Sequence, residues 1–194
     1  MLRRSLLSLG VAIALGSCGG CEDSSENSEG LEALQAARAK ARAARYLVAV
    51  DDGGQRIEFA PGVTVISRRG RVLLWARRDV EYALSTGRGC YERHTDFERA
   101  DLVEVRRDIV VPQALIDEAE LAESGGHPLI RWRGPVNERG SQVEGRLYLD
   151  RARRPVLKRE RIVWAVRHPR GGWLDRRYRY PANLDLDPPE PRCP

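Results

Sequence analysis

Alternation of apolar and polar residues in the last third of the chain constrains the fold more than any other feature. In residues 143–150, Val143, Gly145, Leu147 and Leu149 alternate with Glu144, Arg146 and Tyr148. A period of two places successive side chains on opposite faces of a β-strand. One apolar face and one arginine-rich face are typical of an antiparallel sheet that packs on a core with one face and is exposed to solvent on the other. The pattern therefore predicts an antiparallel sheet, and the lack of sustained heptads in the sequence excludes a coiled coil.

Similar short runs recur along most of the chain. Turn signals at residues 51–54, 61–62 and 69–70 separate the first of them. We predict strands over residues 46–50, 56–59, 63–66, 71–76, 80–84, 102–106, 129–133, 143–150, 156–167 and 173–180. This spacing is that of a meander, and a sheet of about ten strands curls.

Two helices are expected beside the sheet. Residues 31–45 are strong helix formers, with Leu34, Ala37 and Ala41 at helical spacing. Arginines on the opposite side predict a solvated helix face, or else a surface that meets anionic lipid headgroups. Residues 112–123 predict a second, mid-chain helix, which begins at a proline and is closed by Gly125-Gly126.

These elements predict a mainly β protein of the α+β class. We expect one domain over residues 31–180, a curved antiparallel meander that forms an open half-barrel with one helix before it and one in mid-chain. Residues 181–194 contain five of the eleven prolines. Proline cannot donate to a strand ladder, so this tail should run along the surface as an extended strap.

The first 17 residues have the three parts of a secretory signal peptide. Arg3 and Arg4 precede an apolar stretch that ends in small residues, and the stretch is shorter than the about 20 residues of a membrane span. The sequence Leu15-Gly16-Ser17-Cys18 resembles a bacterial lipobox. That resemblance implies that Cys18 becomes the acylated first residue of an exported protein anchored on the extracytoplasmic side of a membrane. The alternative is ordinary cleavage that leaves Cys18 a plain thiol.

The segment after the predicted signal peptide and the remaining cysteines concern two links: the tether to the anchor and the attachment of the C-terminal tail. The segment 18–30 is acidic and nearly free of apolar residues, which predicts a flexible tether. In an oxidising compartment, a bond between Cys90 and Cys193 would fasten the proline-rich tail. The alternatives are a bond between Cys21 and Cys193, or two free thiols.

The order of elements over about residues 31–185 resembles a known group of carriers. An alanine-rich helix leads into an up-and-down sheet, followed by a mid-chain helix, a Gly-Arg-Leu-Tyr-Leu-Asp strand at residues 145–150, and long hairpin strands. This arrangement is similar to the LolA-like lipoprotein carriers and to the lipid-anchored LppX and LprG family. The resemblance implies a half-barrel around a hydrophobic cavity that carries acyl chains in the cell envelope.

Candidate ligand-binding residues follow from alternation within the strands. We expect a set of apolar residues to face the concave side, either lining a cavity or forming plain sheet core: Val63, Val65, Val72, Leu74, Tyr82, Leu147, Leu149, Ile162, Trp164 and Val166.

Nothing in the sequence predicts an enzyme. Motifs for zinc proteases, serine hydrolases and phosphate loops are missing from it. Cys90 and His94 would share one face of a strand, yet lie about 13 Å apart at about 3.3 Å per residue, too far for a nucleophile and its base or for a shared metal. We expect no catalytic residue, no metal and no cofactor.

Charge supplies an alternative function. The chain has 33 basic and 28 acidic residues, and Lys40 and Lys158 are its lysines, so arginine carries most of the positive charge. Export and the alternation of arginines along strands argue against a nucleic-acid partner. The alternative to an apolar-ligand carrier is therefore a non-enzymatic surface or scaffold lipoprotein, a monomer whose arginine-rich face binds an anionic polymer or a protein partner.

Overall fold

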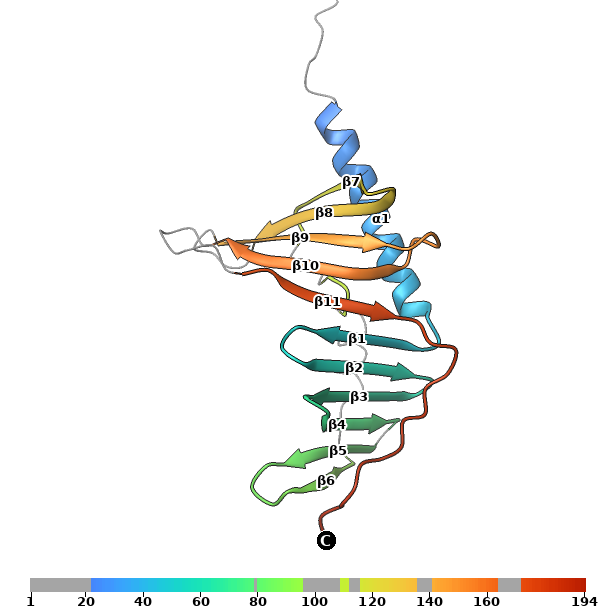
Figure 1. Cartoon of the computed structure of the whole chain (residues 1–194), viewed down its shortest axis with the longest axis vertical. Coiled ribbons are helices and arrows are strands. Elements are labelled where there is room, and N and C mark those ends of the chain that lie inside the picture. The colour runs from blue at the N-terminus through green and yellow to red at the C-terminus, as the bar shows by residue number, and fades with distance from the viewer. Residues whose placement is uncertain (1–21, 79, 96–108, 112–115, 136–140, 164–171) are drawn as a thin grey trace, which may run out of the picture.

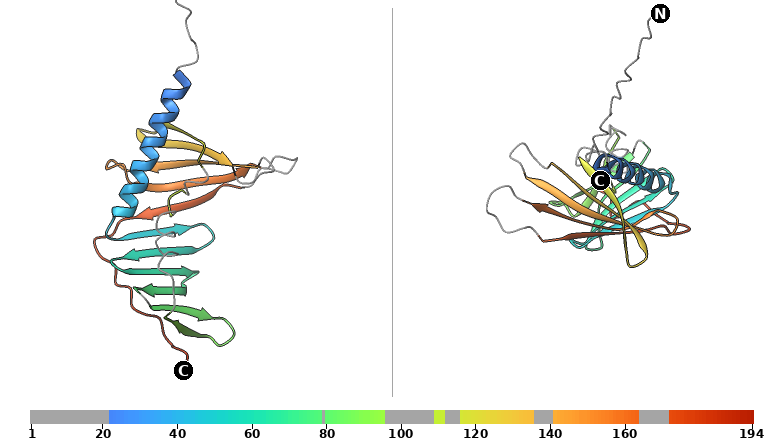
Figure 2. Two further views of the ribbon diagram at one scale, coloured as in Figure 1. Left: turned by 180° about the vertical axis from the view of Figure 1, so that it is seen from behind. Right: turned by 90° about the horizontal axis from the view of Figure 1, so that it is seen from above.

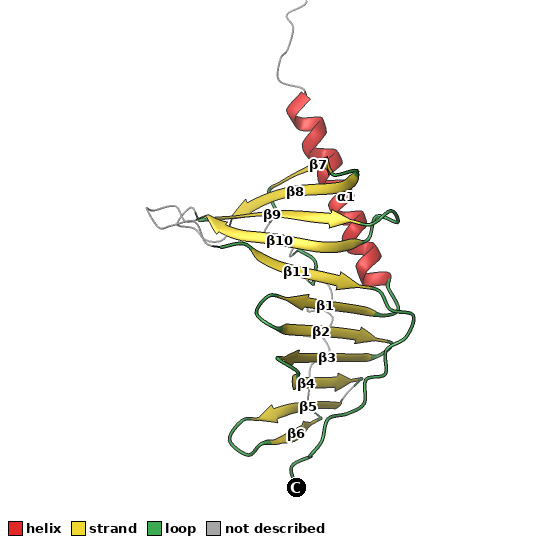
Figure 3. Ribbon diagram, viewed as in Figure 1, coloured by secondary structure: helices red, strands yellow, loops and turns green. Residues whose placement is uncertain are grey.

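The computed structural model describes residues 22–78, 80–95, 109–111, 116–135, 141–163 and 172–194. They form an open, curved antiparallel sheet of eleven strands, with a helix packed against one face (Figures 1 and 3). The predicted signal peptide, Cys18 and Cys21 lie outside the described residues.

The strands form two meanders. The first consists of β1 (Leu47–Asp51), β2 (Gln55–Ala60), β3 (Val63–Arg68), β4 (Arg71–Arg77), β5 (Val80–Ser85) and β6 (Cys90–His94). The second consists of β7 (Glu118–Ser124), β8 (His127–Pro135), β9 (Gln142–Leu149), β10 (Pro155–Val163) and β11 (Leu174–Arg179). Strand β1 pairs with β11, which gives the order β6-β5-β4-β3-β2-β1-β11-β10-β9-β8-β7.

Most of the predicted strands are confirmed. Burial in β9 alternates as its sequence does, since Val143, Gly145, Leu147 and Leu149 are buried and the residues between them are not. The predicted strand at residues 102–106, and the end of the one predicted over 156–167, lie outside the described residues.

Helix α1 (Glu22–Ala43) begins earlier than the predicted start at Leu31. It lies over one face of the β7–β10 half of the sheet (Figure 2). Asn27 Oδ1 accepts a hydrogen bond from the backbone N–H of Ala119 at 2.9 Å, and a Cβ on Gly30 would lie 1.9 Å from the Ala119 carbonyl oxygen. The acidic segment predicted to be a flexible tether is therefore helical from Glu22 and packs on β7. No helix in the described part of the chain is long and apolar enough to cross a membrane.

The predicted mid-chain helix is wrong over residues 118–123. These residues belong to β7, which pairs with β8 so that Ala119 lies opposite Trp132 and Leu121 opposite Ile130. Glutamate, alanine and leucine favour a helix, but Ala119 and Leu121 also alternate with Glu118 and Glu120, and pairing in the sheet overrides local propensity. Residues 112–115, the first part of the predicted helix, lie outside the described residues.

Two apolar clusters lie on opposite faces of the sheet. The larger one includes Leu34 and Ala37 of α1 and Leu47, Phe59 and Leu147 of the sheet. We call the face that α1 covers the inner face. The smaller cluster, Val65, Trp75, Tyr82 and Tyr91, lies on the other side, which we call the outer face.

The C-terminal tail is a strap, as predicted. It runs along the strand ends of the first meander (Figure 1) and packs Leu186 on the smaller cluster, where Trp75 Nε1 donates a hydrogen bond to the Leu186 carbonyl at 2.9 Å. Near its end, Tyr91 N donates to Pro191 O, and Cys193 N donates to Tyr91 O, each at 2.9 Å. The predicted disulfide between Cys90 and Cys193 is confirmed.

We expect Cys193→Ser to lower the free energy of unfolding by about 2–4 kcal/mol. The two cysteines are 103 residues apart in sequence, so the bond closes a long loop and restricts the unfolded chain. Urea unfolding of the variant and of the oxidised wild type measures the difference. Cys90→Ser should give the same loss. An unchanged midpoint in both variants would show that the strap is held without the bond.

Candidate functional site

The predicted lining residues do not share one face. Residues directly opposite each other on paired antiparallel strands project from the same face of a sheet. Val65 lies opposite Trp75, which lies opposite Tyr82, whereas Leu147 lies opposite Ile130. Val63, Val65, Val72 and Tyr82 therefore belong to the outer cluster, beneath the strap.

The other described members of the set lie on the inner face. Leu147 and Leu149 belong to the inner core, Leu74 lies opposite Ile66 at its margin, and Ile162 lies opposite Val143. Trp164 and Val166 lie outside the described residues. The expectation of a single shared face is thus corrected: alternation gives the period within a strand, but the register and a bulge between Ile66 and Ser67 decide which face each strand turns inward.

The inner face is the largest apolar surface that the fold assembles. Leu47, Phe59, Ile130, Leu147 and Leu149 are at most 2% exposed, so other protein atoms lie directly against them. Leu34, Ala37 and Ala41 of α1 supply part of that cover, and the predicted seam of the helix is confirmed.

Residues 109–111 supply another part of the cover, and the sequence did not predict it. Ile109, Val110 and Val111 are buried in the inner core, although they belong to the connection between β6 and β7 and not to the sheet. Three consecutive β-branched residues could have indicated a buried segment, but they lie between a predicted strand and a predicted helix.

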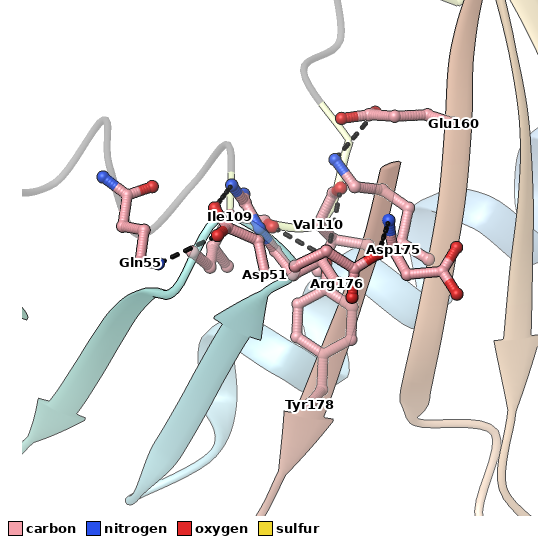
Figure 4. Close-up of polar contacts among 10 residues, drawn as sticks. Asp51, Gln55, Ile109, Val110, Glu160, Asp175, Arg176 and Tyr178 are labelled. Atoms are coloured by element: carbon pink, nitrogen blue, oxygen red, sulfur yellow. Dashed lines mark hydrogen bonds and ion pairs between the residues drawn. The ribbon is translucent and has the colours of Figure 1, made fainter. Parts of the chain in front are cut away.

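Tyr178 holds this segment against the sheet. Its hydroxyl donates a hydrogen bond to the Ile109 carbonyl at 2.9 Å, and the Val110 carbonyl lies 3.4 Å away (Figure 4). Burial raises the pKa of the Tyr178 hydroxyl far above its ordinary value, so the tyrosine remains a donor over the physiological range.

A cluster of charged residues borders the apolar surface on the same face. Lys158 Nζ lies 2.8 Å from Glu160 Oε2, and Arg176 Nη2 lies 3.5 Å from Asp51 Oδ2 (Figure 4 shows this region). The Lys158 side chain is 4% exposed, and its burial lowers the pKa of the ammonium, an effect that the Glu160 carboxylate partly opposes. The cluster joins β1, β10 and β11, and its two cations are matched by two carboxylates.

Trp132 belongs to the inner core and adjoins these charges. Its ring packs so closely on Gly145, the residue opposite it on β9, that a Cβ there would lie 2.2 Å from a ring atom. Glu160 lies opposite Gly145 on the other side, on β10. Trp132 Nε1 is buried and has no hydrogen-bond partner within the described structure. An unpaired buried donor costs about 1–3 kcal/mol, so this N–H is a ready contact for a polar atom of a ligand.

The histidines and cysteines form no site in the described ranges. Cys90 is in the disulfide, His94 is exposed further along β6, and His127 is exposed at the start of β8. His168 lies outside the described residues. Among the residues that the structure describes, no group of three or more possible metal ligands comes together.

We expect Tyr178→Phe to lower the free energy of unfolding by about 1–2 kcal/mol, since it leaves the buried Ile109 carbonyl without its donor. Hydrogen exchange should show weaker protection at residues 109–111 than in the wild type. Tyr46→Phe, which removes a hydroxyl from a partly exposed ring, is the control. Unchanged protection in Tyr178→Phe would contradict the assigned role.

Stability should fall as the pH rises above about 10. Burial raises the pKa of Tyr178 and Tyr180 in the folded protein, whereas an unfolded tyrosine titrates near pH 10. Their contribution is therefore complete below about pH 10 and is lost as the pH rises toward the folded-state values. Urea midpoints measured from pH 8 to about 11 should decline less steeply for Tyr178→Phe. An equal slope for both proteins would be the contrary result.

A comparison with protein-family models finds no match for this chain, and a comparison with curated proteins finds none either.

Proposed function

We propose that this protein is an exported, lipid-anchored protein of the bacterial cell envelope that binds an acyl chain on the inner face of its sheet. In this proposal the open sheet acts as a half-barrel, and the acyl chain takes the place of residues 109–111. The observation that carries the proposal is that residues 109–111, which belong to none of the eleven strands, are buried in the apolar core of the inner face.

The two covers of the inner face are attached differently. Helix α1 packs along several strands and is fixed at its start by the contacts of Asn27 and Gly30 with Ala119. Residues 109–111 contribute three aliphatic side chains and the hydrogen bonds from Tyr178. The segment is therefore the part of the cover that a ligand displaces at the lower cost.

The magnitudes favour such an exchange. Uncovering one isoleucine and two valines forfeits about 5–9 kcal/mol, at about 1.5–3 kcal/mol for each side chain. An acyl chain with about fourteen methylenes gains about 11 kcal/mol when fully buried, at about 0.8 kcal/mol per methylene. A chain of ordinary membrane-lipid length thus offsets the loss of the cover.

The polar residues beside the apolar surface suit the other end of an amphiphile. Trp132 Nε1 offers an unused donor, and Lys158 lies within the same buried border. A carboxyl or ester oxygen there would replace the missing partner of the indole, while the chain lies along Leu147 and Ile130.

We expect Val110→Ala to increase the affinity of a dansyl fatty acid by up to about tenfold, because weakening the cover by about 1.4 kcal/mol lessens its competition with the probe. Fluorescence titration of the purified, delipidated protein measures the affinity. Mass spectrometry of extracts from undelipidated protein should also reveal retained acyl species.

Val65→Ala is the matched control for this experiment. Val65 is also a buried valine, at 4% exposure against 1% for Val110, but it belongs to the outer cluster. The control should lose stability without gaining affinity. Equal gains in both variants would indicate general loosening, and absence of probe binding to all three proteins would eliminate the inner face as an acyl site.

A further inference from the structure

The outer face of the second meander carries arginines in cross-strand rows. Arg131, Arg146 and Arg159 lie directly opposite one another on β8, β9 and β10. Neighbouring strands are about 4.8 Å apart, so three guanidinium groups start from backbone positions within about 10 Å. Arg133 and Arg161 occupy the neighbouring row, on either side of Glu144. We call these five residues the arginine face.

Acidic side chains offset only part of this charge. Four of the five arginines have a carboxylate partner: Arg131 pairs with Glu120, Arg133 with Glu118, Arg159 with Asp175 and Arg161 with Glu144. Arg146, at the centre, has no ion pair among the described residues and has an arginine on each side. Like charges directly opposite each other in a sheet are unfavourable, and an external anion would relieve the repulsion.

Trp173 holds the centre of this face in place. Its ring centroid is 5.4 Å from the Arg146 guanidinium carbon, 6.0 Å from that of Arg159 and 4.6 Å from that of Arg161. Stacking on an aromatic ring keeps an arginine extended while its N–H donors remain available. The arginine face is therefore an ordered set of guanidinium groups, and Arg146 at its centre has donors for phosphate or carboxylate oxygens.

The place of α1 indicates which anionic surface lies nearby. The helix begins at Glu22, four residues along the chain from the expected acylated Cys18, so only residues 19–21 separate the two. Four extended residues span no more than about 14 Å. The first turns of α1 pack on β7, the edge strand next to β8, so the anchored end of the molecule is also the end that carries the arginine face (Figure 1).

We propose that the arginine face docks on the anionic surface of the lipid bilayer to which the protein is anchored. The choice of a bilayer as the partner rests on the expected anchor at Cys18. Docking would orient the anchored domain. It would use the outer face of the sheet, which lies opposite the inner face. The proposal does not depend on acyl-chain binding by that inner face.

Vesicle binding by the non-acylated protein tests the proposal. The chain from residue 18 onward, with Cys18→Ser, retains every described element and has no lipid of its own. It should bind vesicles of phosphatidylglycerol and phosphatidylcholine but not vesicles of phosphatidylcholine alone, and high salt should release it. Each arginine near a charged membrane contributes about fivefold, so the triple variant Arg131→Gln, Arg146→Gln, Arg159→Gln should lose about a hundredfold in affinity.

A second triple variant controls for net charge. Arg68→Gln, Arg71→Gln, Arg88→Gln removes the same number of arginines, all three exposed, from the first meander and should retain nearly wild-type binding. Val110→Ala should leave vesicle binding unchanged, which separates this test from that of acyl binding. Equal losses in both triple variants would overturn the proposal. Tight binding of soluble polyphosphate without binding of anionic vesicles would also overturn it, since the partner would then be a polymer.

Discussion

The pairing of β1 with β11 is the interaction on which the rest of the structure depends. It joins residues near the two ends of the domain, with Ala49 opposite Tyr178 and Asp51 opposite Arg176. Without this ladder the chain would form two separate meanders, each with a half-covered apolar face. With it, the inner face continues from β2 to β7, and Tyr178 on β11 lies within it, where its hydroxyl reaches the 109–111 segment. Such long-range pairing also predicts slow folding, because distant segments must meet before either meander gains its full core.

Strands β1, β2 and β7–β11 bury their apolar residues on the inner face, whereas β3–β6 bury a second set on the outer face, and this division separates two kinds of surface. On the β7–β11 side, the inner face packs against α1 and the outer face carries arginine. On the β3–β6 side, the outer face holds Val65, Trp75 and Tyr82 beneath the C-terminal strap. A one-residue irregularity in the pairing of β3 with β4 places Val72 and Leu74 on opposite faces, although they are two positions apart in the sequence. The strap is thus a structural cover, required because part of the outer face is apolar.

Local sequence patterns predicted most of the strands, since alternation and glycine turns act within a few residues of each other. The disulfide was predictable because Cys193 lies in a proline-rich tail that can neither continue a strand ladder nor form a helix. Three features depended on distant partners and could not be found this way. Residues 118–123 are strand because β8 pairs with them, residues 22–30 are helical where they meet Ala119, and the face of each lining residue follows from register across the sheet. The arginine rows were visible as alternation, but their alignment across three strands was not.

Both edges of the open sheet are already engaged by other parts of the chain. At β7, the N–H of Ala119 is taken by the side chain of Asn27, and at β6, the N–H and carbonyl of Tyr91 bond to the strap at Pro191 and Cys193. An unprotected edge strand invites another chain to add to the sheet, which leads to aggregation. Helix α1 and the strap therefore protect the two edge strands of a long open sheet against edge-to-edge association with other chains.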